Sequence, residues 1–167
     1  NNTWYVECTD QSSGELTNQS EIRNILVDVT TPTLAYINPT PEEGSFQNIA
    51  SITFNVTHNE TANPDSILIY VNGDINETRK YQSGIHQYTN FTVTFGTGTH
   101  NFSIDINDTA GNNNSLATKT FIVDLSAPRV AYINPTPDHN HNQSSSTFSV
   151  NITHNETNPD TIILYLN

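Results

Sequence analysis

Polar and apolar residues alternate along several short stretches of the chain with a period of two, which is the pattern of a half-buried β-strand. In residues 51–58, Phe54 and Val56 point one way and the polar residues between them point the other way. The same alternation runs through 89–96 and 100–107. No stretch shows the 3.6-residue period of a helix, so the pattern predicts an all-β protein.

Turn-forming sequences separate these stretches, at 38–44, 60–65, 72–74 and 108–114. Strands are expected at 33–37, 51–58, 66–72, 78–83, 89–96, 100–107 and 117–124. About seven short antiparallel strands in roughly 96 residues are typical of an immunoglobulin-like β-sandwich. A module of that size can bury an adequate core.

The chain repeats itself with a spacing of about 96 residues, which fixes its architecture. VDVTTPTLAYINPTP (27–41) returns as VDLSAPRVAYINPTP (123–137). NVTHNETANPDSILIYVN (55–72) returns as NITHNETNPDTIILYLN (151–167), with Ala62 as an insertion. Tandem immunoglobulin-like modules are therefore expected.

The N-terminus matches the end of this unit, because WYVECTD (4–10) aligns with FSIDIND (102–108). We therefore divide the chain into three parts. Residues 1–29 are the C-terminal strands of a preceding module, 30–125 are a complete module, and 126–167 are the N-terminal half of a following module. The segment that the two fragments lack corresponds roughly to 73–97.

Asn-x-Ser/Thr acceptor sites for N-glycosylation are over-represented. With 24 Asn and 38 Ser and Thr in 167 residues, chance predicts about 5.5 sites. The chain has twelve: Asn1, Asn18, Asn55, Asn59, Asn76, Asn90, Asn101, Asn107, Asn113, Asn142, Asn151 and Asn155.

Several of these sites fit the strand period, because residues i and i+2 of a strand share a face. The middle residue then points into the core, and it is Val56, Phe91, Phe102 or Ile152. The plainer interpretation, a polar outer face without sugar, leaves the excess of this spacing unexplained. A glycan coat would also protect exposed strand edges. N-linked glycans are the only covalent addition that we expect.

The charge excludes some classes of partner. The chain has a net charge of −12, with 17 acidic and 5 basic residues, so it cannot neutralise a run of phosphates, and an anionic membrane surface repels it. No apolar segment is long enough to span a bilayer. Without a methionine or a leader sequence, the chain is expected to be a processed product or a window of a longer one.

Metal sites have weak support. Asp105 and Asp108 are candidate calcium ligands, together with nearby asparagines and the junction residues Asp28 or Asp124. Loop aspartates more often cap turns, and the spacing is not that of an EF-hand, so no metal site is assigned.

The histidines point to structure more than to metal binding. His139 and His141, in an Asn-rich loop, are a still weaker pair for a transition metal, whereas His58 and His154 are expected to complete the inward row of a strand.

Catalysis has little support either. No nucleophile elbow, His-Glu-x-x-His helix or phosphate-binding glycine loop occurs in the sequence. The acidic pair Glu42 and Glu43 lies in a proline-rich turn, and the second copy has Asp138 and His139 there. We therefore expect a non-enzymatic protein.

Two stretches of the chain share a signature, WYVECTDQSSGE…VDVTTP and FSIDINDTAGNNN…VDLSAP. They resemble the tandem immunoglobulin-like modules of large bacterial and archaeal cell-surface proteins. The resemblance implies an extracellular stalk, adhesin, surface-layer component or filament, and no particular ligand. It also implies that a cysteine at the Cys8 position often pairs with one on the facing sheet, where Ile67 and Ile162 stand here. Cys8 would then have its partner in the absent part of its module, and a lone buried thiol is the alternative.

Two functions remain open from the sequence. The first is a structural, glycosylated filament or stalk, in which the partners are identical copies or adjacent modules, head to tail. Either a neighbouring copy completes the half-modules by strand addition, or the residues that continue a longer chain do so. The second is an adhesin that recognises glycans or proteins on another cell, for which Tyr81, His86 and Tyr88 are the candidate contacts.

Overall fold

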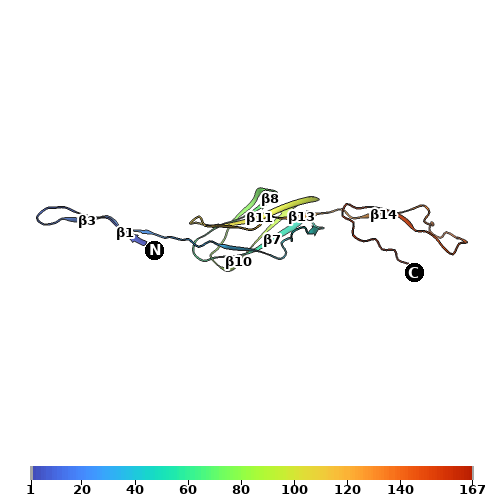
Figure 1. Cartoon of the computed structure of the whole chain (residues 1–167), viewed down its shortest axis with the longest axis horizontal. Coiled ribbons are helices and arrows are strands. Elements are labelled where there is room, and N and C mark those ends of the chain that lie inside the picture. The colour runs from blue at the N-terminus through green and yellow to red at the C-terminus, as the bar shows by residue number, and fades with distance from the viewer. Residues whose placement is uncertain (1, 167) are drawn as a thin grey trace.

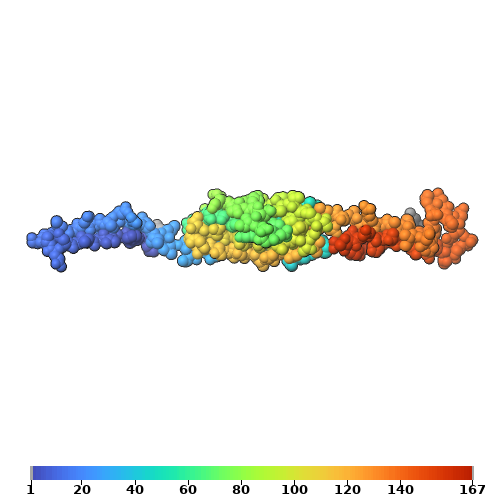
Figure 2. All heavy atoms as spheres, turned by 90° about the horizontal axis from the view of Figure 1, so that it is seen from above, coloured from blue at the N-terminus to red at the C-terminus, as the bar shows by residue number. Residues whose placement is uncertain are grey.

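The computed structural model describes residues 2–166 and contains only strands, turns and loops. A β-sandwich occupies the middle of an elongated molecule, with hairpins extending from both of its ends (Figure 1). The space-filling view shows the thick central body and the two narrow arms (Figure 2). The expected all-β class is confirmed.

Two sheets form the central sandwich. One contains β5 (Thr33–Ile37), β7 (Ser51–Glu60) and β10 (Gly84–Thr94) in the order β10-β7-β5. The other has the order β6-β13-β11-β8-β9, and β12 also pairs with β11. Its strands are β6 (Phe46–Gln47), β8 (Pro64–Val71), β9 (Asp74–Lys80), β11 (Gly98–Asp108), β12 (Asn113–Ser115) and β13 (Lys119–Val123).

The core lies between these two sheets, on the inward residues of the alternating strands. Phe54 of β7 is fully buried, and its ring centroid lies 4.5 Å from that of Phe102 on β11. Phe95 and Phe121 pack edge-on against Phe54, each 6.0 Å away. Such aromatic contacts add about 0.5–1.5 kcal/mol each to the burial of the rings, so this cluster holds the two sheets together.

The strands follow the alternation of the sequence, with a few differences. β9 begins at Asp74 and ends at Lys80, earlier than the expected 78–83. The reason is a tight turn in which Asn72 and Gly73 both have positive φ, 54° and 91°, as a two-residue hairpin requires. Two short strands, β6 and β12, were not expected, and β6 pairs with β13 in parallel.

The N-terminal arm has the register of the end of the sandwich. It consists of β1 (Asn2–Trp4), β2 (Glu7–Thr9), β3 (Thr17–Gln19) and β4 (Arg23–Ile25). Trp4 pairs with Arg23 as Phe102 pairs with Lys119. The β2–β3 pairing likewise follows that of β11 with β12.

The C-terminal arm has the register of the beginning of the sandwich. β14 (Arg129–Ile133) pairs with β15 (Asn151–Asn155), residue for residue as β5 pairs with β7. Thr136 hydrogen bonds the backbone of Asn151, as Thr40 does that of Asn55. Local sequence therefore determines these pairings even where no second sheet covers them.

Candidate functional site

The junction between the N-terminal arm and the sandwich is held by Asp28. Its Oδ1 accepts the backbone N–H of Thr30 at 2.9 Å, and its Oδ2 accepts Nδ2 of Asn63 at 2.5 Å. Asn112 donates its Nδ2 to the backbone oxygen of Asp28 at 3.2 Å. The linker is thus bound to two loops at the end of the next module, and we call the Asp28–Asn63 pair the junction clamp.

The second junction has the same clamp. Asp124 accepts the backbone N–H of Ser126 at 2.9 Å and Nδ2 of Asn158 at 2.7 Å. Asn158 is the counterpart of Asn63, since both begin an Asn-Pro-Asp sequence just after the repeated heptad. The same linker and loop residues therefore make the same contact twice.

Both clamp carboxylates are ionised at neutral pH. Hydrogen bonds from Thr30 and then from Asn63 hold the pKa of Asp28 below its ordinary value of 3.8. Those from Ser126 and Asn158 lower the pKa of Asp124 in the same way. A lowered carboxyl pKa means that the hydrogen bonds stabilise the folded state fully at pH values above 3.8. The clamp hydrogen bonds are therefore formed at neutral pH and weaken only in acid.

The predicted glycan acceptors fall into two groups. Asn1 lies outside the described residues. Exposed acceptors are Asn18, Asn76, Asn90, Asn101, Asn113, Asn142, Asn151 and Asn155, and the half-buried ones are Asn55, Asn59 and Asn107.

An exposed and a half-buried acceptor lie side by side on the outer face of the smaller sheet, where Asn90 of β10 pairs with Asn55 of β7. The middle residues Val56, Phe91 and Phe102 are fully buried, as expected. Ile152 is only half-buried, because its sheet is uncovered.

Some acceptor side chains have structural hydrogen bonds. Asn107 accepts Oγ of Ser66 at 2.6 Å and donates its Nδ2 to Asp65 at 3.0 Å. Asn55 donates its Nδ2 to the backbone oxygen of Asn38 at 3.2 Å. Nδ2 is the atom to which an N-linked glycan attaches, so these acceptors are less available than the exposed ones.

The structure does not bring the two calcium candidates together. Asp108 points into the sandwich, where it accepts the backbone N–H and Nδ2 of Asn112, both at 2.8 Å. Asp105 lies on the outer face of β11, because odd and even residues of this strand point in opposite directions. Within residues 2–166, no cluster of three or more His, Cys, Asp or Glu could hold a metal ion.

The repeated histidines occupy inward positions, and only one of them is covered. His58 is buried, its Nε2 lies 3.0 Å from Oγ1 of Thr89, and its ring packs edge-on against Tyr81. Burial lowers the pKa of His58 below 6.5. His154, its counterpart on β15, is exposed, as are His139 and His141 in the loop between β14 and β15.

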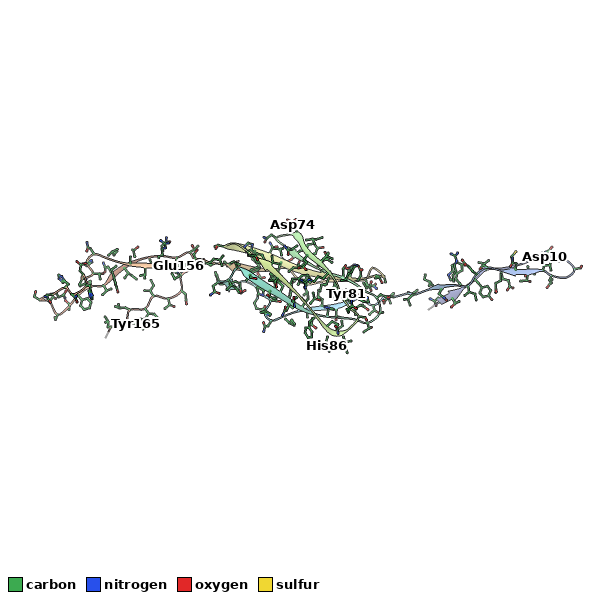
Figure 3. All side chains as sticks on the ribbon, turned by 180° about the vertical axis from the view of Figure 1, so that it is seen from behind. Asp10, Asp74, Tyr81, His86, Glu156 and Tyr165 are labelled. Carbon is green, nitrogen blue, oxygen red and sulfur yellow. The ribbon has the colours of Figure 1, made fainter. Side chains whose placement is uncertain are left out.

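The three candidate contacts of an adhesin do not form one patch. Tyr81 is buried in the sandwich and donates its hydroxyl to the backbone oxygen of Asn107 at 3.2 Å. Burial raises the pKa of Tyr81 to about 12. His86 and Tyr88 are exposed on the edge strand β10, and Figure 3 shows His86 at the rim of the sandwich, away from Tyr81.

The remaining chemical candidates have structural contacts. Lys119 donates its Nζ to Oε2 of Glu42 at 2.6 Å, and Glu43 accepts the backbone N–H of Thr120 at 2.7 Å. This acidic pair therefore holds β13 in place. Cys8 is exposed as a free thiol, which does not match the buried-thiol alternative. Ile67 pairs with Ile106 on the adjacent strand of one sheet, so the expectation of a facing-sheet position is wrong.

Sequence reasoning missed the clamp asparagines. The signal was present, because Asn-Pro-Asp occurs at the same place in both copies, but it was interpreted only as a turn. The aspartate of the Val-Asp junction was likewise considered only as a metal ligand. Side-chain contacts between a linker and a distant loop have no local pattern in the sequence.

The fold defines a class: an immunoglobulin-like β-sandwich, here with a β-hairpin arm on either side. No protein-family model and no curated protein matches the chain. Among solved structures, the fibronectin(III)-like modules of Clostridium thermocellum CbhA are similar at 10% identity with a TM-score of 0.36, covering 55% of this chain and 93% of that one. In the described part of the chain, no helix is long and apolar enough to cross a membrane.

Proposed function

We propose that this chain is a structural component of an N-glycosylated extracellular filament or cell-surface stalk made of serial immunoglobulin-like modules. The observation that carries the proposal is the junction clamp, which occurs at both junctions with the same residue types and the same hydrogen bonds. A contact that is repeated at each joint is what a serial array needs.

The linker of the first joint is short and has further fixed contacts. Pro32, which ends the linker, is fully buried, and Asn114 donates its Nδ2 to the backbone oxygen of Pro32 at 3.1 Å. Proline also restricts the residue before it to extended conformations. Modules joined in this way add up to a quasi-linear object, in which each module contacts its neighbours only.

The exposed acceptors support a glycan coat on this array. They lie on the outer faces, for example Asn90 on β10 and Asn101 on β11, whereas the residue after each of them fills the core. A sugar can therefore be attached without disturbing the packing. N-glycosylation is a modification of secreted and cell-surface proteins, so the acceptor sites support the proposed extracellular location, and the net charge of −12 favours neither nucleic acid nor membrane insertion.

The protein is proposed to be non-enzymatic. Its buried polar groups are used structurally, since Asp108 binds its own loop and His58 bonds a strand neighbour. The acidic pair of the proline-rich turn fastens a strand. No cofactor is proposed beyond the glycans.

The mass of the native protein before and after glycan removal tests this proposal. We expect a loss of mass on glycan removal, with the sugars mapped to exposed acceptors such as Asn90 and Asn101. Electron microscopy of the native material should show thin, fairly straight fibres or stalks. An unchanged mass would contradict the glycan coat, and compact particles would contradict the serial array.

The alternative function is an adhesin that recognises glycans or proteins of another cell. It is favoured by the first residues of the edge strand β10, where Ile85 and Tyr88 are 65% and 72% exposed beside His86. Exposed aromatic and apolar residues together are typical of binding surfaces. A glycan-array screen with the deglycosylated chain should then give a hit that Tyr88→Ala abolishes, and no hit would count against this function.

A further inference from the structure

The outer face of β10 carries one aromatic side chain in a row of polar ones. Tyr88, Asn90 and Thr92 occupy alternate positions of this strand, and all three are exposed. Phe91, which lies between the last two, is fully buried. Alternate residues of a strand point to the same side of the sheet. The tyrosine, the glycan acceptor and the threonine of the acceptor site therefore stand in one line on the solvent side.

The ring of Tyr88 is left open by the residues around it. Its side chain is 72% exposed. It pairs across the strands with Thr57 of β7, which in turn pairs with Ala35 of β5, so only short side chains stand beside it on that side. β10 is the edge strand of its three-stranded sheet. Within residues 2–166, no strand therefore covers the ring from the other side.

The acceptor Asn90 is close enough to place a sugar on this ring. Residues two apart on a strand lie about 7 Å from one another along the same face. The first sugar of an N-linked glycan is joined directly to Nδ2 of the asparagine. A sugar on Asn90 therefore lies beside the two neighbours on its face, which are Tyr88 on one side and Thr92 on the other.

The chemistry of a tyrosine ring suits the face of a sugar. A pyranose has hydroxyl groups around its rim and C–H groups on its faces. The face of an aromatic ring is electron-rich and attracts such slightly positive C–H groups. Contact between the two also removes apolar surface of both from water. The phenolic hydroxyl of Tyr88 can in addition donate to, or accept from, a hydroxyl of the sugar rim.

This arrangement occurs at one acceptor only. Of the twelve acceptors in the sequence, Asn90 is the only one that follows an aromatic residue by two positions. Asn101 on β11 provides the comparison, because it is also exposed and is followed by a buried phenylalanine, Phe102. Two positions before Asn101 stands Thr99, which is exposed but has no ring. The two acceptors therefore form a matched pair, with and without an aromatic neighbour.

We propose that Tyr88 is the binding residue for the first sugar of the glycan on Asn90. This inference rests on the proposed glycosylation and adds a contact between the glycan and the module. The sugar lies along β10 and covers the open ring. The glycan is thereby held against the edge strand, where it hinders pairing with a strand of another chain. The glycan on Asn101 has no such contact and extends freely into solvent.

A double-mutant cycle in the glycosylated full chain tests this contact. Tyr88→Ala removes the ring, Asn90→Gln removes the sugar, and a third variant carries both changes. Urea denaturation gives the folding equilibrium constant of each. We expect Tyr88→Ala to lower this constant about two- to tenfold, the size of one aromatic contact, and to have little effect once the sugar is absent. Tyr88→Phe keeps the ring and should retain the wild-type value within about twofold.

Two controls isolate the sugar. The same cycle in the full chain produced without glycosylation should show no coupling, because the ring then has nothing to bind. In the glycosylated chain, the corresponding cycle of Thr99→Ala with Asn101→Gln should also show none. Coupling of equal size with and without sugar, or at both acceptors, would overturn the proposal.

The protons of the sugar give a direct readout of the ring. Protons that lie over an aromatic face resonate upfield, because the ring current opposes the applied field. The C–H protons of the Asn90 sugar should therefore lie upfield of those of the Asn101 sugar. Tyr88→Ala should abolish this shift and Tyr88→Phe should preserve it, whereas a purely structural role of Tyr88 would not move it.

The outcomes separate this inference from the proposed function. Sugars at Asn101 but none at Asn90, or a sugar at Asn90 with neither coupling nor upfield shift, would overturn the binding role of Tyr88 and leave the glycan coat in place. A chain without sugar at any acceptor would overturn both. Binding of free glycans to the fully glycosylated chain through Tyr88 would assign the ring to another cell and would also overturn the proposal.

Discussion

The complete module and the two arms contain equivalent sequences in different surroundings. Phe102 is fully buried, and its counterpart Trp4 is 49% exposed. Nevertheless the two residues have corresponding partners, Lys119 and Arg23, in corresponding hairpins. The pairing of neighbouring strands is therefore encoded locally, whereas burial depends on a second sheet. A single hairpin is only marginally stable in water, so the pairing within the arms alone contributes little to the stability of the chain.

The largest difference should appear when the same position is truncated in the sandwich and in the C-terminal arm. Phe54→Ala removes the centre of the aromatic cluster and should lower the free energy of unfolding of the module by about 3–5 kcal/mol. Val150→Ala, at the equivalent position, should change it by less than about 0.5 kcal/mol. Urea denaturation followed by circular dichroism, at a concentration where the chain is monomeric, measures both values. Similar effects would mean that the arm already has a closed core.

The buried and the exposed histidine should differ in their effect on pH stability. The lowered pKa of His58 means that the unfolded chain binds a proton more readily than the folded one. Its contribution is therefore fully present above pH 6.5 and is lost as the pH falls below that value. His58→Gln should flatten this part of the stability profile, and His154→Gln should leave it unchanged. An unchanged profile for His58→Gln would show that another group causes the acid sensitivity.

The clamp should affect the joint more than the module. Asn63→Ala removes one hydrogen bond and should cost about 1 kcal/mol or less in unfolding free energy, but it should loosen the arm. Nitroxide labels on Cys8 and on Thr92→Cys would report the width of the distance distribution across the joint. We expect a broader distribution for Asn63→Ala and no change for Asn113→Ala, which lies outside the clamp. Equal widths would contradict a stiff joint.

The smallest structural effect concerns the glycan acceptors, where occupancy should follow exposure. Asn101 and Asn107 lie on the same strand, but Asn107 is half-buried and bonded to Ser66 and Asp65. Glycopeptide mass spectrometry of the native protein should find Asn101 occupied and Asn107 largely free. Equal occupancy would show that the sugar is added before this strand folds.

Much of the fold could be predicted from the sequence, because a period of two determines which side chains face inward. The strand at 33–37 was predicted with its observed bounds, and those around Phe54 and Phe102 with errors of one or two residues at their ends. β9 was misplaced because Asn72 and Gly73 close a tighter turn than expected. The two-residue strand β6 has no alternation to detect, and its parallel partner lies far away in the chain.

The candidate site was only partly predictable. Acceptor spacing can be read directly from the sequence, but the bonds that occupy Asn107 come from strands distant in sequence, so its reduced availability could not be foreseen. The two calcium candidates were placed together by proximity along the chain. On a strand, the odd spacing of Asp105 and Asp108 puts them on opposite faces, and this argument was available from the sequence alone.

The clamp has a consequence for how the proposed array would change over generations. Its aspartate lies at the end of one unit and its asparagine about a third of the way into the next, and both junctions carry the same residue types. Any unit can therefore follow any other and still form the joint. In the proposed array, a gene that gains or loses whole units would keep the same contact at every joint, so the length of the proposed array could change without any change in the strength of its joints.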